Sequence, residues 1–372
     1  MVQLQEERAG TRCSFGDAER DGDRDLRDLV IKTLEQHKIG PVDCHKLAEE
    51  QMARQGSLPK LLGALGEMDQ SGVFQEKSHD KSKYIFQAVM RHLGLGVTYV
   101  NAEGSQWVYT GLEIEDSGTL DSSIFYWHTT TGVENDIPEA SRDESIHLFT
   151  VASQYNAAEA LDPHTPCVGK AMEDSKKDNT QGPLAQRTNP IIFEVVNAFL
   201  ANLSFNMLER VLPAGSHLEH GYLRPDESTV KKLGDTMCKN YAKIECPCYE
   251  SKPRADGESV YLMLGAAPAL AYAKIKHLTE TCQPLEINTP DFYNLEYWAY
   301  LGSFSTQFKQ ALFLIKAHPD KKVVLHITGT GIGVFGCHEE IFTTAFKKAA
   351  AFLFFLSILL VIFGIYWIYS WN

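Results

Sequence analysis

Hydrophobic positions repeat at two different periods along this chain of 372 residues. Over residues 26–68 they recur every three or four residues, which is typical of helices that bury one face. Further along, short apolar runs such as 147–152 and 323–327 alternate with long amphipathic segments such as 294–317. This alternation predicts an α/β fold, with a largely parallel or mixed sheet between layers of helices.

Changes in composition divide the chain into four parts. Residues 1–25 are charged and show no hydrophobic period, so they are predicted to form a solvated, disordered tail. A small helical region is expected over residues 26–83, either as a cap on the main domain or as a set of partner-binding helices. The α/β domain is expected over residues 84–350, and a separate hydrophobic segment over residues 350–371.

The hydrophobic segment at the end of the chain carries no charged side chain. At about 1.5 Å per residue, a helix of this length would cross a hydrocarbon core about 30 Å thick. Aromatic residues stand at its far end and two lysines at its near end, as membrane interfaces favour: Trp367, Tyr369, Trp371, Lys347 and Lys348. The segment predicts a C-terminal transmembrane helix, with the protein at a membrane and the preceding domain facing the cytosol. The alternative is a buried helix of the globular core, although such a helix usually has a polar stripe.

Charge and cysteine content restrict the possible partners. The formal net charge of −13 argues against nucleic acid as a ligand, because phosphate neutralisation dominates that kind of affinity. The eight cysteines are dispersed, and the spacing of Cys246 and Cys248 matches no usual pair of zinc ligands. No metal site and no cofactor are therefore predicted.

The clearest candidate for chemistry follows the apolar run 323–327. Four glycines lie in the next few residues, and a helical pattern with an acidic first turn comes after them: Gly329, Gly331, Gly333 and Gly336. Glycines let main-chain N–H groups approach an oxyanion closely, and the start of a helix adds partial positive charge. The pattern predicts a cradle for a phosphate or diphosphate. Its alternative is a turn that only packs a strand against a helix.

The same glycines suggest a second ligand class. Gly331, Gly333 and Gly336 spell G-x-G-x-x-G, the fingerprint of NAD-type dinucleotide folds. That fold needs an acidic residue at the end of a second strand about 20 residues further on. Here that distance falls in the uncharged tail. Dinucleotide binding therefore remains the weaker alternative.

Three stretches resemble a known family. The stretch VVLHITGTGIGVFGCHEEIFTTAF resembles the last strand, phosphate loop and helix of macrodomains, especially of their poly(ADP-ribose) glycohydrolase-like branch. The segments VASQYNAAEALDP and DNTQGPLAQ are similar to a macro-like group with SQ[FY]NxxE and TQGP signatures. The resemblance covers about residues 147–350. It implies a three-layer α/β/α macrodomain-like sandwich with a mixed sheet, which binds ADP-ribose or an ADP-ribosylated protein.

The resemblance also implies roles for individual residues. The phosphates would be held by the glycine loop, through Gly329, Gly331, Gly333, Val334, Phe335 and Gly336. The ribose would be lined by Ser153, Gln154, Asn156 and Glu159, and the rim would be closed by Thr180, Gln181 and Gly182. An ADP-ribosyl glycohydrolase needs a carboxyl group near the scissile ribosyl bond, for which Glu159 is the first candidate and Asp162 the second. Asn156 could instead cap a helix, and Glu159 could be a solvated acid of its first turn.

One departure bears on activity. The hydrolase branch carries a triple-glycine loop followed by a Gln-Glu-Glu segment, and this chain has neither. The resemblance therefore favours nucleotide binding over hydrolysis. A third possibility is a scaffold that binds no nucleotide and presents surfaces for protein interaction at a membrane, because fold analogy alone does not select a function.

Overall fold

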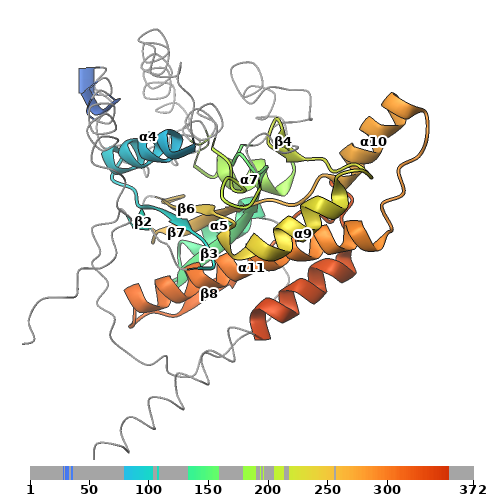
Figure 1. Cartoon of the computed structure of the whole chain (residues 1–372). Helices are drawn as coiled ribbons and strands as arrows, with labels where there is room; N and C mark the ends of the chain where they lie inside the picture. Colours follow the sequence, from blue (N-terminus) through green and yellow to red (C-terminus); the bar gives the residue numbers. More distant parts are fainter. Residues whose placement is uncertain are drawn as a thin grey trace, which may run out of the picture.

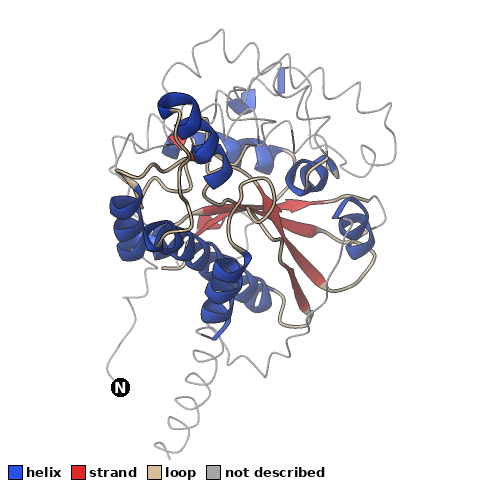
Figure 2. Cartoon of the chain, turned by 90° about the vertical axis from the view of Figure 1, so that its right-hand side faces the viewer, coloured by secondary structure: helices blue, strands red, loops and turns tan. Residues whose placement is uncertain are grey.

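The computed structural model contains a six-stranded sheet with helices on both of its faces (Figures 1 and 2). It describes residues 28, 30–32, 35–36, 79–103, 107–108, 133–158, 179–189, 193, 196, 205–212, 218–254 and 257–351. The predicted tail over residues 1–25, and most of the predicted helical region over residues 26–83, lie outside these residues.

The sheet is mixed. Its strands are β1 (Val97–Val100), β2 (Trp107–Val108), β3 (Ile146–Ala152), β6 (Cys246–Ser251), β7 (Val260–Gly265) and β8 (Val323–His326), in the order β2-β1-β6-β7-β3-β8. Strand β3 is parallel to both of its neighbours, β7 and β8, whereas β1, β2 and β6 pair antiparallel. The carboxyl ends of β3, β7 and β8 therefore lie along one edge of the sheet. A separate ribbon joins β4 (Leu218–Glu219) to β5 (Tyr222–Leu223).

Two helix layers explain why the central strands are apolar on both faces. On one face, α4 (His79–His92) places Phe86 against Tyr249 of β6, with ring centroids 6.4 Å apart. On the other face, α11 (Pro290–Ala317) places the Ser303 hydroxyl 3.5 Å from the position that a Cβ atom at Gly265 of β7 would take. A strand that is covered on both faces has a sequence that is a nearly continuous hydrophobic run.

The remaining helices flank these layers. They are α5 (Val133–Ala140), α7 (Gln181–Arg187), α9 (Val230–Asn240), the short 3-10 helix η2 (Tyr241–Lys243) and α10 (Leu270–Thr281). Helix α9 packs along α11, and α7 packs on β3 and α5. In Figure 1, α11 runs beneath the sheet and α4 lies above it.

The predicted C-terminal transmembrane helix is wrong: none of the helices that the structure describes is both long enough and apolar enough to cross a membrane. Residues 352–371 of the predicted span lie outside the described residues. The fold class is corrected to a mixed α/β fold without that span. The membrane localisation and the cytosolic orientation depended on the span, and they are corrected with it.

The last described helix, which contains only residues 350–351 of the predicted span, packs on the globular domain. The chain is helical over residues 339–351, and this helix buries Ala345 and Ala349. Phe342 and Phe346 pack on Phe304 of α11, with ring centroids 4.9 Å and 5.3 Å apart. The two lysines at residues 347 and 348 are exposed. A helix with one buried and one charged face belongs to the globular domain.

Candidate functional site

Two of the segments that resemble the macro-like group meet at one carbonyl oxygen of β3. Nε2 of Gln181 donates to the Thr150 oxygen at 3.1 Å, and Oγ1 of Thr328 donates to the same oxygen at 2.9 Å. Oε1 of Gln181 accepts from the N–H of Ala152 at 2.8 Å. Because β8 ends at His326, which pairs with Phe149, the rest of β3 has no described strand beside it on that edge. The Gln181 amide supplies hydrogen-bond partners for the main chain of β3 there.

The third segment continues directly from β3. The N–H of Ser153 donates to the Gly265 oxygen of β7 at 2.9 Å, and the Ser153 hydroxyl donates to the Gln154 oxygen at 3.1 Å. Nε2 of Gln154 donates to the hydroxyl of Tyr222 at 2.6 Å. Both side chains are buried, so their described contacts fix the end of the strand.

Asn156 shapes the turn that follows. Its Oδ1 accepts from the N–H of Ala158 at 3.1 Å, which spans a turn in which Ala157 has a φ of 65°. Its side chain also covers Gly221, where a Cβ atom would lie 2.4 Å from the Asn156 Cγ. In the described contacts, Asn156 spans the turn to Ala158 and covers Gly221.

The other predicted residues differ in their exposure. Thr180 precedes α7 and is exposed, whereas Gly182 in its first turn is buried. The two candidate acids, Glu159 and Asp162, lie outside the described residues.

The glycine loop has a fixed backbone shape. Gly331 and Gly336 have φ values of 85° and 69°, in the left-handed region that favours glycine. The N–H of Cys337 donates to the Gly331 oxygen at 3.0 Å, and the N–H of Gly336 donates to the Gly333 oxygen at 3.0 Å. The loop is therefore folded on itself.

Neighbouring elements hold the base of the loop. The hydroxyl of Tyr300 on α11 donates to the Thr330 oxygen at 2.8 Å, and the thiol of Cys337 donates to the Pro268 oxygen at 3.1 Å. The Phe335 oxygen accepts from the N–H of Ala271 at the start of α10, at 2.8 Å. A β-carbon at Gly331 would lie 2.5 Å from the Cβ of Ala267, so the loop sits tightly against the segment after β7.

The tip of the loop is open. A Cβ atom at Gly333 would meet nothing within 4 Å, and Val334 is 59% exposed. Within the part of the chain that the structure describes, the N–H groups of Gly333, Val334 and Phe335 at the tip, and that of Gly331 at the base, donate no hydrogen bond. The tip thus combines unoccupied main-chain donors with free space.

The helix after the loop adds less to an anion site than the sequence predicts. The N–H of His338 at its start donates to Oε2 of Glu296 at 2.9 Å. Glu296 comes from α11, and its side chain is completely buried. A protein carboxylate therefore occupies the helix start, and the donors left for a ligand are those of the loop tip.

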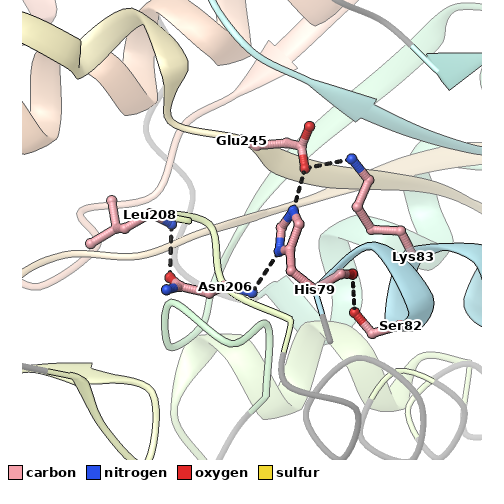
Figure 3. A network of polar contacts seen from close by, with 6 residues as sticks. All are labelled: His79, Ser82, Lys83, Asn206, Leu208 and Glu245. Atoms are coloured by element: carbon pink, nitrogen blue, oxygen red, sulfur yellow. Dashed lines mark hydrogen bonds and ion pairs between the residues drawn. The ribbon is translucent and has the colours of Figure 1, made fainter. Parts of the chain in front are cut away.

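Sequence patterns missed a second polar cluster, shown in Figure 3, which joins α4 to β6. Nζ of Lys83 lies 2.7 Å from Oε1 of Glu245, and Nε2 of His79 lies 3.1 Å from the same oxygen. Nδ1 of His79 accepts from the N–H of Asn206 at 3.1 Å, so its ring proton is on Nε2. The one available signal was spacing, since Lys83 stands three and seven residues before buried Phe86 and Met90.

Burial and charge act in opposite directions on Glu245. Burial alone would raise its pKa, but the hydrogen bond from His79 and the positive charge of Lys83 lower the pKa to about 2. The carboxylate is therefore ionised in the folded protein at neutral pH. All three side chains are buried, so the cluster reads as a structural connection between α4 and the sheet.

The buried cysteines fit a structural role too. Cys246 and Cys248 lie in β6, and burial raises the pKa of Cys246 to about 12, so its thiol stays protonated. Among the described residues, no group of three or more His, Cys, Asp and Glu side chains is placed to hold a metal ion.

Taken together, the fold and the site define a mixed α/β protein with a glycine loop at the carboxyl edge of its parallel strands. Comparisons with protein-family models, curated proteins and solved structures give no match. The function must therefore be argued from the site itself.

Proposed function

We propose that this protein binds ADP-ribose or an ADP-ribosylated protein, with the diphosphate at the tip of its glycine loop. The observation that carries the proposal is the set of main-chain N–H groups at Gly331, Gly333, Val334 and Phe335, which donate to no acceptor among the described residues. Successive N–H groups in such a loop form a concave site for an anion.

The place of the loop in the fold supports the same proposal. In open α/β sheets, ligands bind beyond the carboxyl ends of the strands, and the loop directly follows β8 at that edge. Gln181 brings a second resembling segment to the same edge, where it and Thr328 of the loop segment both donate to the Thr150 oxygen. The residues that carry the family resemblance are therefore neighbours, although the chain separates them widely.

The type of donor is consistent with the charge of the chain. A protein with a net charge of −13 gains little from general attraction of an anion, so local main-chain donors must supply the affinity. The loop is held by Tyr300 and Cys337 before any ligand binds, which lowers the ordering cost of binding. Hydrolysis is not part of the proposal, because Glu159 and Asp162 lie outside the described residues.

Calorimetric titration of the full chain with ADP-ribose tests the proposal, with ADP, inorganic diphosphate and NAD as comparison ligands. The sharpest variant is Gly333→Glu, because Gly333 has no positive φ and open space around its missing side chain. The variant should fold normally and place a carboxylate against the diphosphate. We expect its Kd for ADP-ribose to rise at least about tenfold, which is ~1.4 kcal/mol.

Two controls separate this effect from others. Gly333→Ala adds a side chain without charge and should bind within about threefold of the native chain. Thr279→Glu adds the same charge at an exposed position of α10 and should also leave binding unchanged. Absence of binding by the native chain, or native affinity in Gly333→Glu, would overturn the proposal. If NAD binds as tightly as ADP-ribose or more tightly, the result would instead favour the alternative of NAD-type dinucleotide binding.

A further inference from the structure

The junction between the glycine loop and the following helix contains a buried carboxylate paired with a histidine. The Glu296 side chain is 0% exposed and that of His338 is 25% exposed. Oε2 of Glu296 accepts from the His338 main-chain N–H at 2.9 Å, and Oε1 lies 2.7 Å from Nδ1 of the same histidine. One carboxylate therefore binds both the backbone and the ring of His338.

The other ring nitrogen also faces an oxygen. Nε2 of His338 lies 2.8 Å from Oδ1 of Asn288, in the segment before α11. Both N···O contacts need a proton between their atoms. An imidazolium beside a carboxylate satisfies both, and so does a neutral imidazole beside a protonated Glu296. If that one proton is lost, a single ring proton remains for two acceptors, and one contact becomes repulsive.

We propose that Glu296 and His338 form a proton-dependent positioning pair that holds the glycine loop in its folded shape. His338 ends the loop, two residues after Gly336, so the pair fixes the point where the loop joins the helix. The loop is ordered while the pair keeps its shared proton, and it loosens as the pH rises and the proton leaves. Any effect on ADP-ribose affinity rests on the proposed function, whereas the effect on loop order does not.

Neighbouring titratable groups do not account for a pH-dependent order of the loop. Cys337 and Tyr300 lie beside Glu296, and burial raises the pKa of each well above its ordinary value. Both therefore stay neutral as the pair titrates. The ring of Tyr293 meets His338 edge to face, with centroids 4.8 Å apart, and makes no ion pair among the described residues.

The shift of the Glu296 pKa agrees in direction with the proposed loosening at higher pH. Burial raises its pKa, while the two hydrogen bonds from His338 act in the opposite direction, and the net shift is upward. A carboxyl group with a raised pKa stabilises the fold below its unfolded pKa, and this contribution is lost as the pH rises through the folded pKa. Loosening with rising pH is therefore the expected direction.

Hydrogen–deuterium exchange of the loop peptide over residues 329–338 tests the inference without any ligand. After correction for intrinsic exchange, we expect protection of this peptide in the full chain to fall about tenfold as the pH rises, the size of one charge-assisted hydrogen bond. His338→Gln keeps a donor but has no titratable ring, so its protection should no longer change with pH. His277→Gln removes a histidine from α10 and should retain the native profile.

Glu296→Gln is a second variant that keeps the inference testable if His338→Gln does not fold. Its amide oxygen still accepts from the His338 N–H and its amide nitrogen donates to Nδ1, so the loop should stay protected as the pH rises. An unchanged pH profile in His338→Gln or in Glu296→Gln would overturn the inference. If the profiles change as expected but ADP-ribose does not bind, the proposed function fails and the positioning pair stands.

Discussion

Lys83 of α4 and Glu245, directly before β6, form an ion pair of 2.7 Å, although they are 162 positions apart in the chain. Both side chains are almost completely buried, and the ammonium group also lies 4.7 Å from the centre of the Tyr99 ring. A buried ion pair adds little net stability over a hydrophobic pair, but loss of one partner leaves a charge buried without compensation. The pair therefore fixes how α4 sits on the sheet.

Replacement of Lys83 tests this directly. We expect Lys83→Met to lower the free energy of unfolding by about 3–5 kcal/mol, because the methionine fills the space and leaves the buried Glu245 carboxylate without its cation. Urea denaturation of the full chain measures the change. Lys348→Met, at an exposed position, should change stability by less than about 0.5 kcal/mol. A loss below about 1 kcal/mol in Lys83→Met would show that the pair does not form.

The same cluster predicts that the stability of the protein falls at acidic pH. Because the folded pKa of Glu245 is about 2, below its ordinary value, its contribution is present at neutral pH and lost as the pH falls towards 2. The shift corresponds to roughly 3 kcal/mol. We therefore expect the stability difference between the native chain and Glu245→Gln to be largest near pH 7 and to shrink below about pH 4.5. A difference that stays constant with pH would contradict this assignment.

Replacement by alanine should affect the stability of the protein differently at two glycines of the loop. Gly331→Ala requires a side chain at a φ of 85° and a Cβ atom 2.5 Å from that of Ala267, so we expect a loss of about 2 kcal/mol or more. Gly333→Ala meets no neighbour and no strained φ, so its stability should stay within about 0.5 kcal/mol of the native value. Thermal unfolding of both variants measures the contrast, and equal losses would mean that the loop has another shape.

The amide of Gln181 should matter for the open edge of β3. Gln181→Met keeps the length of the side chain but removes the acceptor for the Ala152 N–H and the donor to Thr150. We expect a loss of about 1–3 kcal/mol, the cost of leaving such groups without partners. Gln283→Met, at an exposed position after α10, provides the matched control. No difference between the two variants in urea denaturation would contradict the role of Gln181.

Some features of the fold could be read from local sequence. The apolar run 323–327 contains β8, and the pattern over residues 294–317 lies within α11. Both signals depend on residues that are close in the chain, where the strand and helix periods are expressed.

Other features depended on partners far along the chain. The C-terminal hydrophobic pattern predicts a membrane helix, yet none of the described helices is long and apolar enough to cross a membrane. The described helix over residues 339–351, which leads into this pattern, packs its apolar face on Phe304. A list of apolar residues does not say whether lipid or another helix will cover them. Strand β6 was also hidden, since Cys246-Pro-Cys248 has no alternating pattern and Pro247 lacks an N–H group.

The sequence by itself determined the glycine positions, the alternation of strands and helices, and the family resemblance that suggests a diphosphate ligand. Only the tertiary structure decided which groups complete the site. It placed Glu296 against His338, 42 residues further on, and so removed the helix start from the anion site. It likewise paired Lys83 with Glu245. The physical reason is that a charge buried by folding takes its partner from whichever element packs beside it, and local periodicity carries no information about that element.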